Sequence, residues 1–214
     1  MQKFLTPKNI LLFCGATIIF FVFVQFSFLV HKNLFTQFDF DTTVRIQNHF
    51  SHKWDVSFSL LSLIGSVEVV SIILLILMGI RRKLSGICIL LFFGVSHLFE
   101  LYGKAFVTHP GPSFFFFRYT LPFVLPSAYV RPGSSYPSGH SARALFLTII
   151  LFFLIQKSRR IHIVQKILIY SFLVLYDLAM LTSRIYLGEH WTTDVIGGSL
   201  LGAAFGLLSG IFLL

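Results

Sequence analysis

Long runs of apolar residues, separated by shorter polar segments, follow one another along the whole chain. Six of these runs are near the roughly 20 residues that an α-helix needs to cross the hydrocarbon core of a bilayer. They extend over about 10–30, 56–80, 84–106, 138–155, 163–184 and 193–214. The pattern predicts an all-α polytopic membrane protein, in which a bundle of six transmembrane helices forms a single domain over residues 1–214.

The composition agrees with this class. The chain is 56% hydrophobic and 12% charged, whereas soluble domains contain about 25% charged residues. Cys14 and Cys88 both lie inside apolar runs, which is typical of small membrane residues and not of a disulfide or a metal pair. The first run follows Lys3 and Lys8, but it is too long for a signal peptide and no small-residue cleavage site follows it. We therefore expect a retained helix.

The net charge of +9 has a simple explanation in a membrane protein. The basic residues gather in segments that lie on one side if the spans alternate, and the positive-inside rule makes that side the cytoplasm. We attribute the positive charge to basic residues that hold the cytoplasmic loops at the anionic leaflet, and we expect no nucleic-acid partner. Both termini are then cytoplasmic, and segments 31–55, 107–137 and 185–192 are extracytoplasmic. The basic residues are Lys3, Lys8, Arg81, Arg82, Lys83, Lys157, Arg159, Arg160 and Lys166.

Polar clusters interrupt the apolar pattern at the outer ends of three spans, where ionisable groups are usually functional. The most informative cluster is SRIYLGEHWTTD, residues 183–194. His190 and Asp194 are four residues apart, so they share a face at the start of a helix. A carboxylate on one imidazole nitrogen raises the basicity of the other, which makes His190 a candidate nucleophile. Arg184, shortly upstream, has a planar fork that suits phosphate oxygens.

The other two clusters supply further groups for a phosphate. Ser138 and Gly139 stand where the fourth span begins, and free N–H groups at a helix start favour an anion. His140 follows them and, when protonated, can donate a proton to a leaving alcohol. Lys104, at the end of the third span, offers a point charge for a phosphate oxygen.

Together the three clusters, over about residues 104–194, resemble the motifs of the type 2 phosphatidic acid phosphatase superfamily. The matching residues are Lys104, Pro137, Ser138, Gly139, His140, Ser183, Arg184, His190 and Asp194. The resemblance implies that His190 becomes phosphorylated, that Asp194 orients it, and that His140 protonates the leaving group and then activates water. It also implies that the phosphate is held by Lys104, Ser138, Gly139 and Arg184. No metal or other cofactor is implied.

One position departs from the family pattern. The first family motif has an Arg before its Pro, whereas this chain has Gly111 before Pro112. A phosphate-binding charge is therefore missing, and three residues are candidates to replace it. Arg143 is favoured first because it shares a helix face with His140; Arg118 comes second, and Arg131 lies in the same loop.

The membrane setting favours a lipid phosphate with its head group at the outer leaflet as the substrate. Phosphatidic acid, phosphatidylglycerol phosphate and a polyprenyl diphosphate such as undecaprenyl diphosphate are the candidates. Two alternatives stay open. The same motifs would serve a phosphotransferase that passes the phosphoryl group to another acceptor, and the missing Arg is also compatible with a catalytically impaired relative that binds lipids.

Several other polar or small residues are expected to be structural. His97 and Glu100 are three residues apart in the third span and predict a hydrogen-bonded pair. Glu189 is expected to be a solvated loop charge. The Phe run at 114–117 is interpreted as an interfacial anchor in preference to the wall of a lipid path. The glycines of the last span predict close helix packing; they are Gly197, Gly198, Gly202 and Gly206.

Overall fold

The computed structural model describes residues 6–81, 84–123, 125–126 and 134–213, which contain helices and no β-strand, so the all-α prediction is confirmed. The helices are α1 (Pro7–His31), α2 (Thr36–His49), α3 (Asp55–Ile64), α4 (Val67–Arg81), α5 (Leu84–Phe106), α6 (Gly139–Lys157), α7 (Ile163–Tyr186) and α8 (Thr192–Gly210), with short 3-10 turns at His52–Trp54 and Phe114–Phe116. Lys3, Arg82, Lys83 and Arg131 of the sequence analysis lie outside the described residues.

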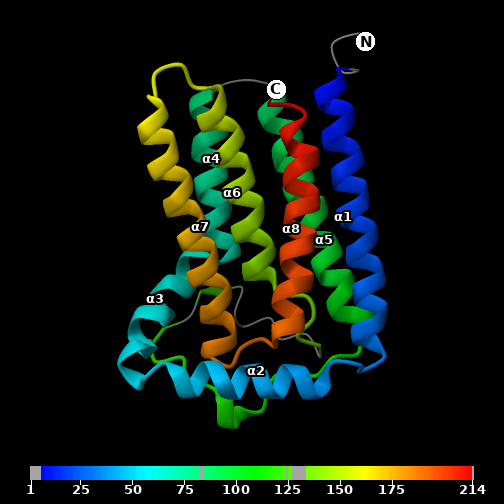
Figure 1. Cartoon of the computed structure of the whole chain (residues 1–214), viewed down its shortest axis with the longest axis vertical. Helices are drawn as coiled ribbons and strands as arrows, with labels where there is room; N and C mark the ends of the chain where they lie inside the picture. The colour runs from blue at the N-terminus through cyan, green and yellow to red at the C-terminus, as the bar shows by residue number, and fades with distance from the viewer. Residues whose placement is uncertain (1–5, 82–83, 124, 127–133, 214) are drawn as a thin grey trace.

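The long helices stand side by side as a bundle (Figure 1). Helices α1 and α4 to α8 share the long axis, and α2 lies across one end of them. Helix α1 begins and α8 ends at the opposite end of the bundle. Five helices in the described part are long and apolar enough to span a membrane by themselves: α1, α5, α6, α7 and α8.

The second predicted span is not one straight helix. The expected helix over 56–80 is divided into α3 and α4, which are bent by 48° at Gly65 and Ser66, so the count is six spans only if the bent pair is one of them. A side chain at residue 65 would meet the Met180 Cε atom at 2.9 Å and the ring of His140 at 3.1 Å. The break frees backbone groups that need partners inside a membrane. The Gly65 carbonyl finds one in Arg143, whose Nε–H donates to it over 3.0 Å.

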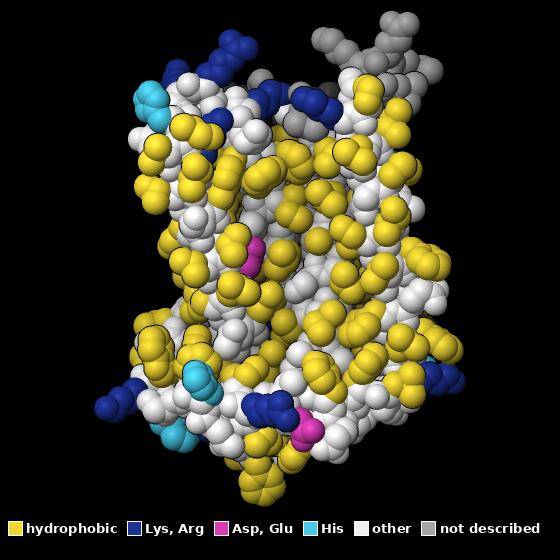
Figure 2. Space-filling model, viewed as in Figure 1, with side chains coloured by type: hydrophobic (Ala, Val, Ile, Leu, Met, Phe, Trp, Pro, Cys, Tyr) yellow, Lys and Arg dark blue, Asp and Glu magenta, His cyan; other side chains and the backbone are white. Residues whose placement is uncertain are grey.

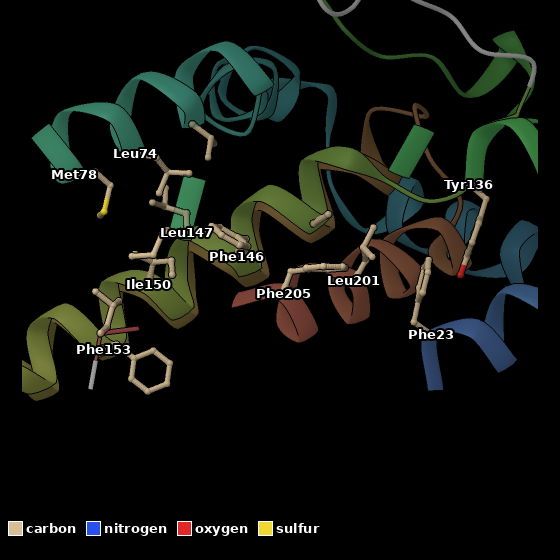
Figure 3. Packing of buried hydrophobic residues seen from close by; sticks show 14 of the residues in the cluster. Phe23, Leu74, Met78, Tyr136, Phe146, Leu147, Ile150, Phe153, Leu201 and Phe205 are labelled. Atoms are coloured by element: carbon tan, nitrogen blue, oxygen red, sulfur yellow. The ribbon is translucent and has the colours of Figure 1, made fainter. Parts of the chain in front are cut away.

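Helices α6 and α8 form the centre of the bundle (Figure 3). Phe146 and Ile150 of α6 are fully buried beside Leu201 of α8 in the main hydrophobic cluster. An added Cβ at Gly202 would collide with the Ala142 carbonyl oxygen, and the predicted packing role of this glycine is therefore confirmed. Because lipid is as apolar as the helices, close van der Waals contact of this kind is what holds them together.

The outside of the bundle is apolar along its middle. Figure 2 shows hydrophobic side chains covering the central part of one face, with Lys and Arg side chains gathered toward its ends. On α7, Leu168, Phe172 and Leu175 are each more than half exposed. A continuous apolar surface of this size fits lipid and not water. The chain is therefore an integral membrane protein.

Helix α2 lies within the segment 31–55, and its orientation is unusual. Asp39, Thr43 and Gln47 follow one another at helical spacing and are all buried against the bundle. Phe38 and Phe40 are about half exposed. The helix thus turns its polar stripe inward, onto the end of the bundle, and its phenylalanines outward.

Candidate active site

His190 and Asp194 lie together at the end of the bundle that α2 covers. Asp194 lies in the first turn of α8 and is fully buried, whereas His190 precedes the helix in the α7–α8 connection. The Asp194 Oδ2 atom accepts the Trp191 backbone N–H at 2.9 Å and lies 3.3 Å from His190 Nδ1. Because a carboxylate only accepts, His190 carries its proton on Nδ1 and keeps a lone pair on Nε2. That is the state a nucleophilic imidazole requires.

Arg184, at the end of α7, is fully buried close to His190. The Arg184 carbonyl accepts the His190 backbone N–H at 3.2 Å. The guanidinium donates from Nη1 to Glu189 Oε2 at 2.6 Å, while its Nε and Nη2 atoms have no protein partner. Leaving buried charged donors unpaired is costly. An anion bound beside His190 would satisfy both of these donors.

The start of α6 supplies the next part of the site. Ser138 is the N-cap of this helix, and its backbone N–H donates to the Asp194 carbonyl over 2.9 Å, which ties α6 to α8. Gly139 is the first helical residue, and an added Cβ there would collide with Glu100 Oε1 and lie 2.6 Å from Arg143 Nη1. Only glycine fits this crowded position, which lets Glu100 and Arg143 come close to the backbone at the start of α6.

His140 occupies the first turn of α6 among four positively charged or titratable groups. Arg184, Arg143, His190 and Lys104 all lie close enough to interact with it electrostatically. Lys104, near the end of α5, donates from Nζ to the Ser135 carbonyl at 3.4 Å. The structure thus gathers groups from α5, α6, α7 and α8 around one point, as the three sequence clusters predict.

Arg143 already has partners in the protein, so less of its guanidinium is available to replace the missing phosphate-binding Arg. Its Nη1 atom donates to Glu100 Oε2 at 2.9 Å, and its Nε–H is taken by the Gly65 carbonyl. Glu100 Oε2 also lies 2.9 Å from His97 Nδ1, so the predicted pair of His97 and Glu100 is confirmed. Glu100 also pairs with Arg143 and partly neutralises the positive charge of Arg143 beside Gly139.

These geometric features coincide with a family match. A model of the PAP2 superfamily matches residues 83–212. The chain belongs to the PAP2 superfamily. Phosphatidylglycerophosphatase B of Bacillus subtilis (strain 168) is 30% identical over 122 residues, which are 57% of this chain. The matched region spans 55%, or about half, of the length of that relative. The resemblance seen in the motifs is thereby confirmed.

Two solved structures have the same PAP2 fold. A transmembrane PAP2-type phosphatidylglycerolphosphate phosphatase from Bacillus subtilis superposes with a TM-score of 0.74 at 22% identity, covering 91% of this chain and 93% of the other. LpxE from Aquifex aeolicus superposes with a TM-score of 0.60 at 26% identity, covering 80% of this chain and 94% of the other. The helical arrangement described above is therefore that of PAP2 membrane proteins.

The Arg118 side chain contacts α2, the segment after it and α7, and its expected role as a second substitute for the missing Arg stays a prediction. Its Nη1 atom donates to the Gln47 carbonyl at 3.2 Å and is 3.5 Å from the Phe50 carbonyl. Its guanidinium lies 5.0 Å from the centre of the Tyr186 ring. Arg118 thus holds its loop against α2 and α7.

Three residues gain a role that the sequence did not indicate. Glu189 is a partner of buried Arg184 and not a free loop charge. Asp39, on α2, accepts from Thr193 beside Asp194, and His109 lies within 3.5 Å of Asp194. The only signal in the sequence was the position of His109 between Lys104 and the departure at Gly111.

The burial of His190 leads to a prediction about pH. Burial lowers the pKa of His190 below its usual 6.5; Asp194 opposes this effect, and Lys104 and Arg184 add to it. The neutral ring therefore persists to a lower pH than that of an ordinary histidine, and a nucleophilic imidazole reacts in its neutral form. We expect kcat/KM to fall on the acid side only below pH 6.5, as measured in a profile from pH 4 to 9. An acid limb centred above pH 7 would contradict this environment for His190.

Proposed function

We propose that this PAP2 protein is a hydrolase that removes the phosphate from a membrane lipid through a phosphorylated His190. One observation carries the proposal. An imidazole held by buried Asp194 lies beside Arg184, a fully buried guanidinium with two donors that have no protein partner. A nucleophile next to an unsatisfied fork for oxygen anions is what phosphoryl transfer needs, because this reaction depends on positioning and charge stabilisation.

The first step is a displacement at phosphorus. The Nε2 lone pair of His190 forms a bond to phosphorus while the bond from phosphorus to the lipid oxygen breaks. His140 gives its proton to that departing oxygen, so the lipid leaves as an alcohol. Arg184 and Lys104 hold the phosphoryl oxygens, together with the helix start at Ser138 and Gly139. Asp194 stabilises the positive charge that develops on the His190 ring.

The second step returns the enzyme to its starting state. Water attacks the phosphorus, the bond to His190 Nε2 breaks, and His140 takes the proton from water. The product is inorganic phosphate. Arg143 contributes to this proposal as a fixed charge beside Gly139, partly neutralised by Glu100. Neither step of the proposed mechanism uses a metal ion.

The relatives and the charge distribution guide the choice of substrate and side. The sequence relative and one of the solved structures, both from Bacillus subtilis, are named as phosphatases of phosphatidylglycerol phosphate, so this lipid is our first candidate, ahead of phosphatidic acid and undecaprenyl diphosphate. Basic residues such as Lys157 and Lys166 lie at the end of the bundle opposite to His190. The positive-inside rule then supports a cytoplasmic location for the ends of α1 and α8 and an extracytoplasmic site.

The test is a panel of the three lipid phosphates, supplied in mixed micelles to the purified protein with EDTA present. We expect labelled inorganic phosphate to be released, with phosphatidylglycerol phosphate as the best substrate. Activity that requires a divalent cation would contradict the metal-free mechanism. Transfer of the label to a lipid or sugar acceptor, without free phosphate, would favour the phosphotransferase. If no lipid is turned over, the remaining alternative is a catalytically impaired relative that binds lipids.

A further inference from the structure

The Asp194 carboxylate has two oxygens with different surroundings. Oδ2 faces the Trp191 N–H and the ring of His190, as described above. Oδ1 is buried and has no hydrogen bond within ordinary limits, but the Nε2 atom of His109 lies 3.5 Å from it. Asp194 is therefore approached by two histidines, one on each oxygen.

The direction of the His109 proton follows from its neighbours. The hydroxyl of Thr193 donates its one hydrogen to Asp39 Oδ2 over 2.7 Å. The same Oγ1 atom lies 3.2 Å from His109 Nε2, so in this contact the hydroxyl accepts and Nε2 carries a hydrogen. The nearest acceptor for that N–H is the Thr193 hydroxyl, and Asp194 Oδ1 at 3.5 Å and Asp39 Oδ2 at 3.6 Å lie farther away.

Both ends of this arrangement are fixed by the fold. Asp39 is 1% exposed, and its Oδ1 atom accepts the Thr193 backbone N–H at 2.8 Å, which joins α2 to the start of α8. The His109 backbone N–H donates to Ser134 Oγ at 3.2 Å, and the His109 carbonyl accepts the Ser135 N–H at 3.0 Å. The ring of His109 thus has little freedom to leave Asp194.

We propose that His109 is a positioning residue, whose Nε2 edge lies against Asp194 Oδ1 and, with Asp39 and Thr193 beside it, fixes the carboxylate that orients His190. The inference rests on the proposed function, because it takes His190 as the nucleophile. A carboxylate held through one oxygen can rotate about its Cβ–Cγ bond. A polar ring packed against the second oxygen restricts that rotation and keeps the Nε2 lone pair of His190 aimed at phosphorus.

This assignment also separates His109 from the missing phosphate ligand near Gly111. The His109 side chain is 7% exposed, and its Nε2 atom is turned to Asp194, Asp39 and Thr193. It therefore acts on the reaction through Asp194 and not by contact with the substrate. The inward orientation of the polar stripe of α2 is also explained, because it places Asp39 beside the ring of His109.

The experiment compares His109→Leu with His109→Gln, whose amide nitrogen can reach the position of Nε2. His49→Leu, on the exposed face of α2, is the matched control. We expect His109→Leu to lower kcat about 10- to 100-fold, as loss of an outer partner of a catalytic group does. KM should change less than about threefold, because uniform binding of substrate is not affected. His109→Gln and His49→Leu should stay within about fivefold of wild-type kcat.

A double-mutant cycle distinguishes positioning from a general loss of structure. If His109 acts through Asp194, adding His109→Leu to Asp194→Asn lowers kcat by less than about twofold further. Multiplicative losses, or a wild-type kcat for His109→Leu, would overturn the inference. Should His109→Leu not fold, Asp39→Asn provides the same cycle, with Asp41→Asn of α2 as its control. Inactivity of the wild type, or full activity of His190→Ala, would instead refute the proposed function.

Discussion

Replacing His190 by Ala is expected to abolish lipid phosphate hydrolysis, with kcat lowered by about 10⁴-fold or more, because removal of a covalent nucleophile has effects of this size. The side chain is only 12% exposed, and its polar contact is with Asp194, so few other functions are lost with it. The measurement is single-turnover and steady-state phosphate release by the purified variant.

The control for this variant is His162→Ala. His162 precedes α7 at the opposite end of the bundle and is exposed, so we expect kcat within about twofold of the wild type. Thermal midpoints of both variants should match that of the wild type. A His190→Ala protein that retains a tenth or more of the activity would rule out this residue as the nucleophile.

Replacing Arg184 by Met should separate activity from stability. Two buried donors of Arg184 have no protein partner, and each such group costs about 1–3 kcal/mol. An apolar side chain of similar size removes that cost but leaves Glu189 without its partner, so the two effects oppose each other and the thermal midpoint should change little. The phosphoryl oxygens lose their fork, and we expect kcat/KM to fall about 10²- to 10³-fold.

The matched control is Arg45→Met on α2, where the arginine is exposed and its loss should leave kcat/KM within about twofold. Arg184→Lys is a second comparison. It restores the charge but not the planar fork, so it should recover only part of the activity. The account of Arg184 fails if Arg184→Met is strongly destabilised while the folded fraction keeps wild-type turnover.

The sequence predicted the helices well where apolar length alone decides them. Helix α5 has the predicted bounds of 84–106 because an uninterrupted apolar run leaves a membrane chain few alternatives to a helix. The second span was wrong as a single helix. Its break at Gly65 depends on Met180 and the ring of His140, which occupy the space beside it from α7 and α6. No local pattern encodes neighbours so distant in the chain.

The same distinction holds for the candidate site. His190 and Asp194 lie four residues apart, so their meeting could be predicted from spacing alone. Asp39 and Thr193 are more than 150 residues apart, and their contact arises only because α2 folds across the bundle end. Arg118 is a further example. Its charge and loop position predict phosphate binding, which stays a prediction, but they do not indicate the carbonyls that engage its guanidinium.

The phosphorylated histidine is the central claim, and the stereochemical course at phosphorus tests it most directly. A lipid phosphorothioate made chiral with oxygen isotopes would be hydrolysed in isotopically labelled water, and the configuration of the released thiophosphate determined. Two successive in-line displacements, at His190 and then by water, predict net retention of configuration. Net inversion would mean that water attacks the lipid phosphate directly, and would contradict a covalent intermediate on His190.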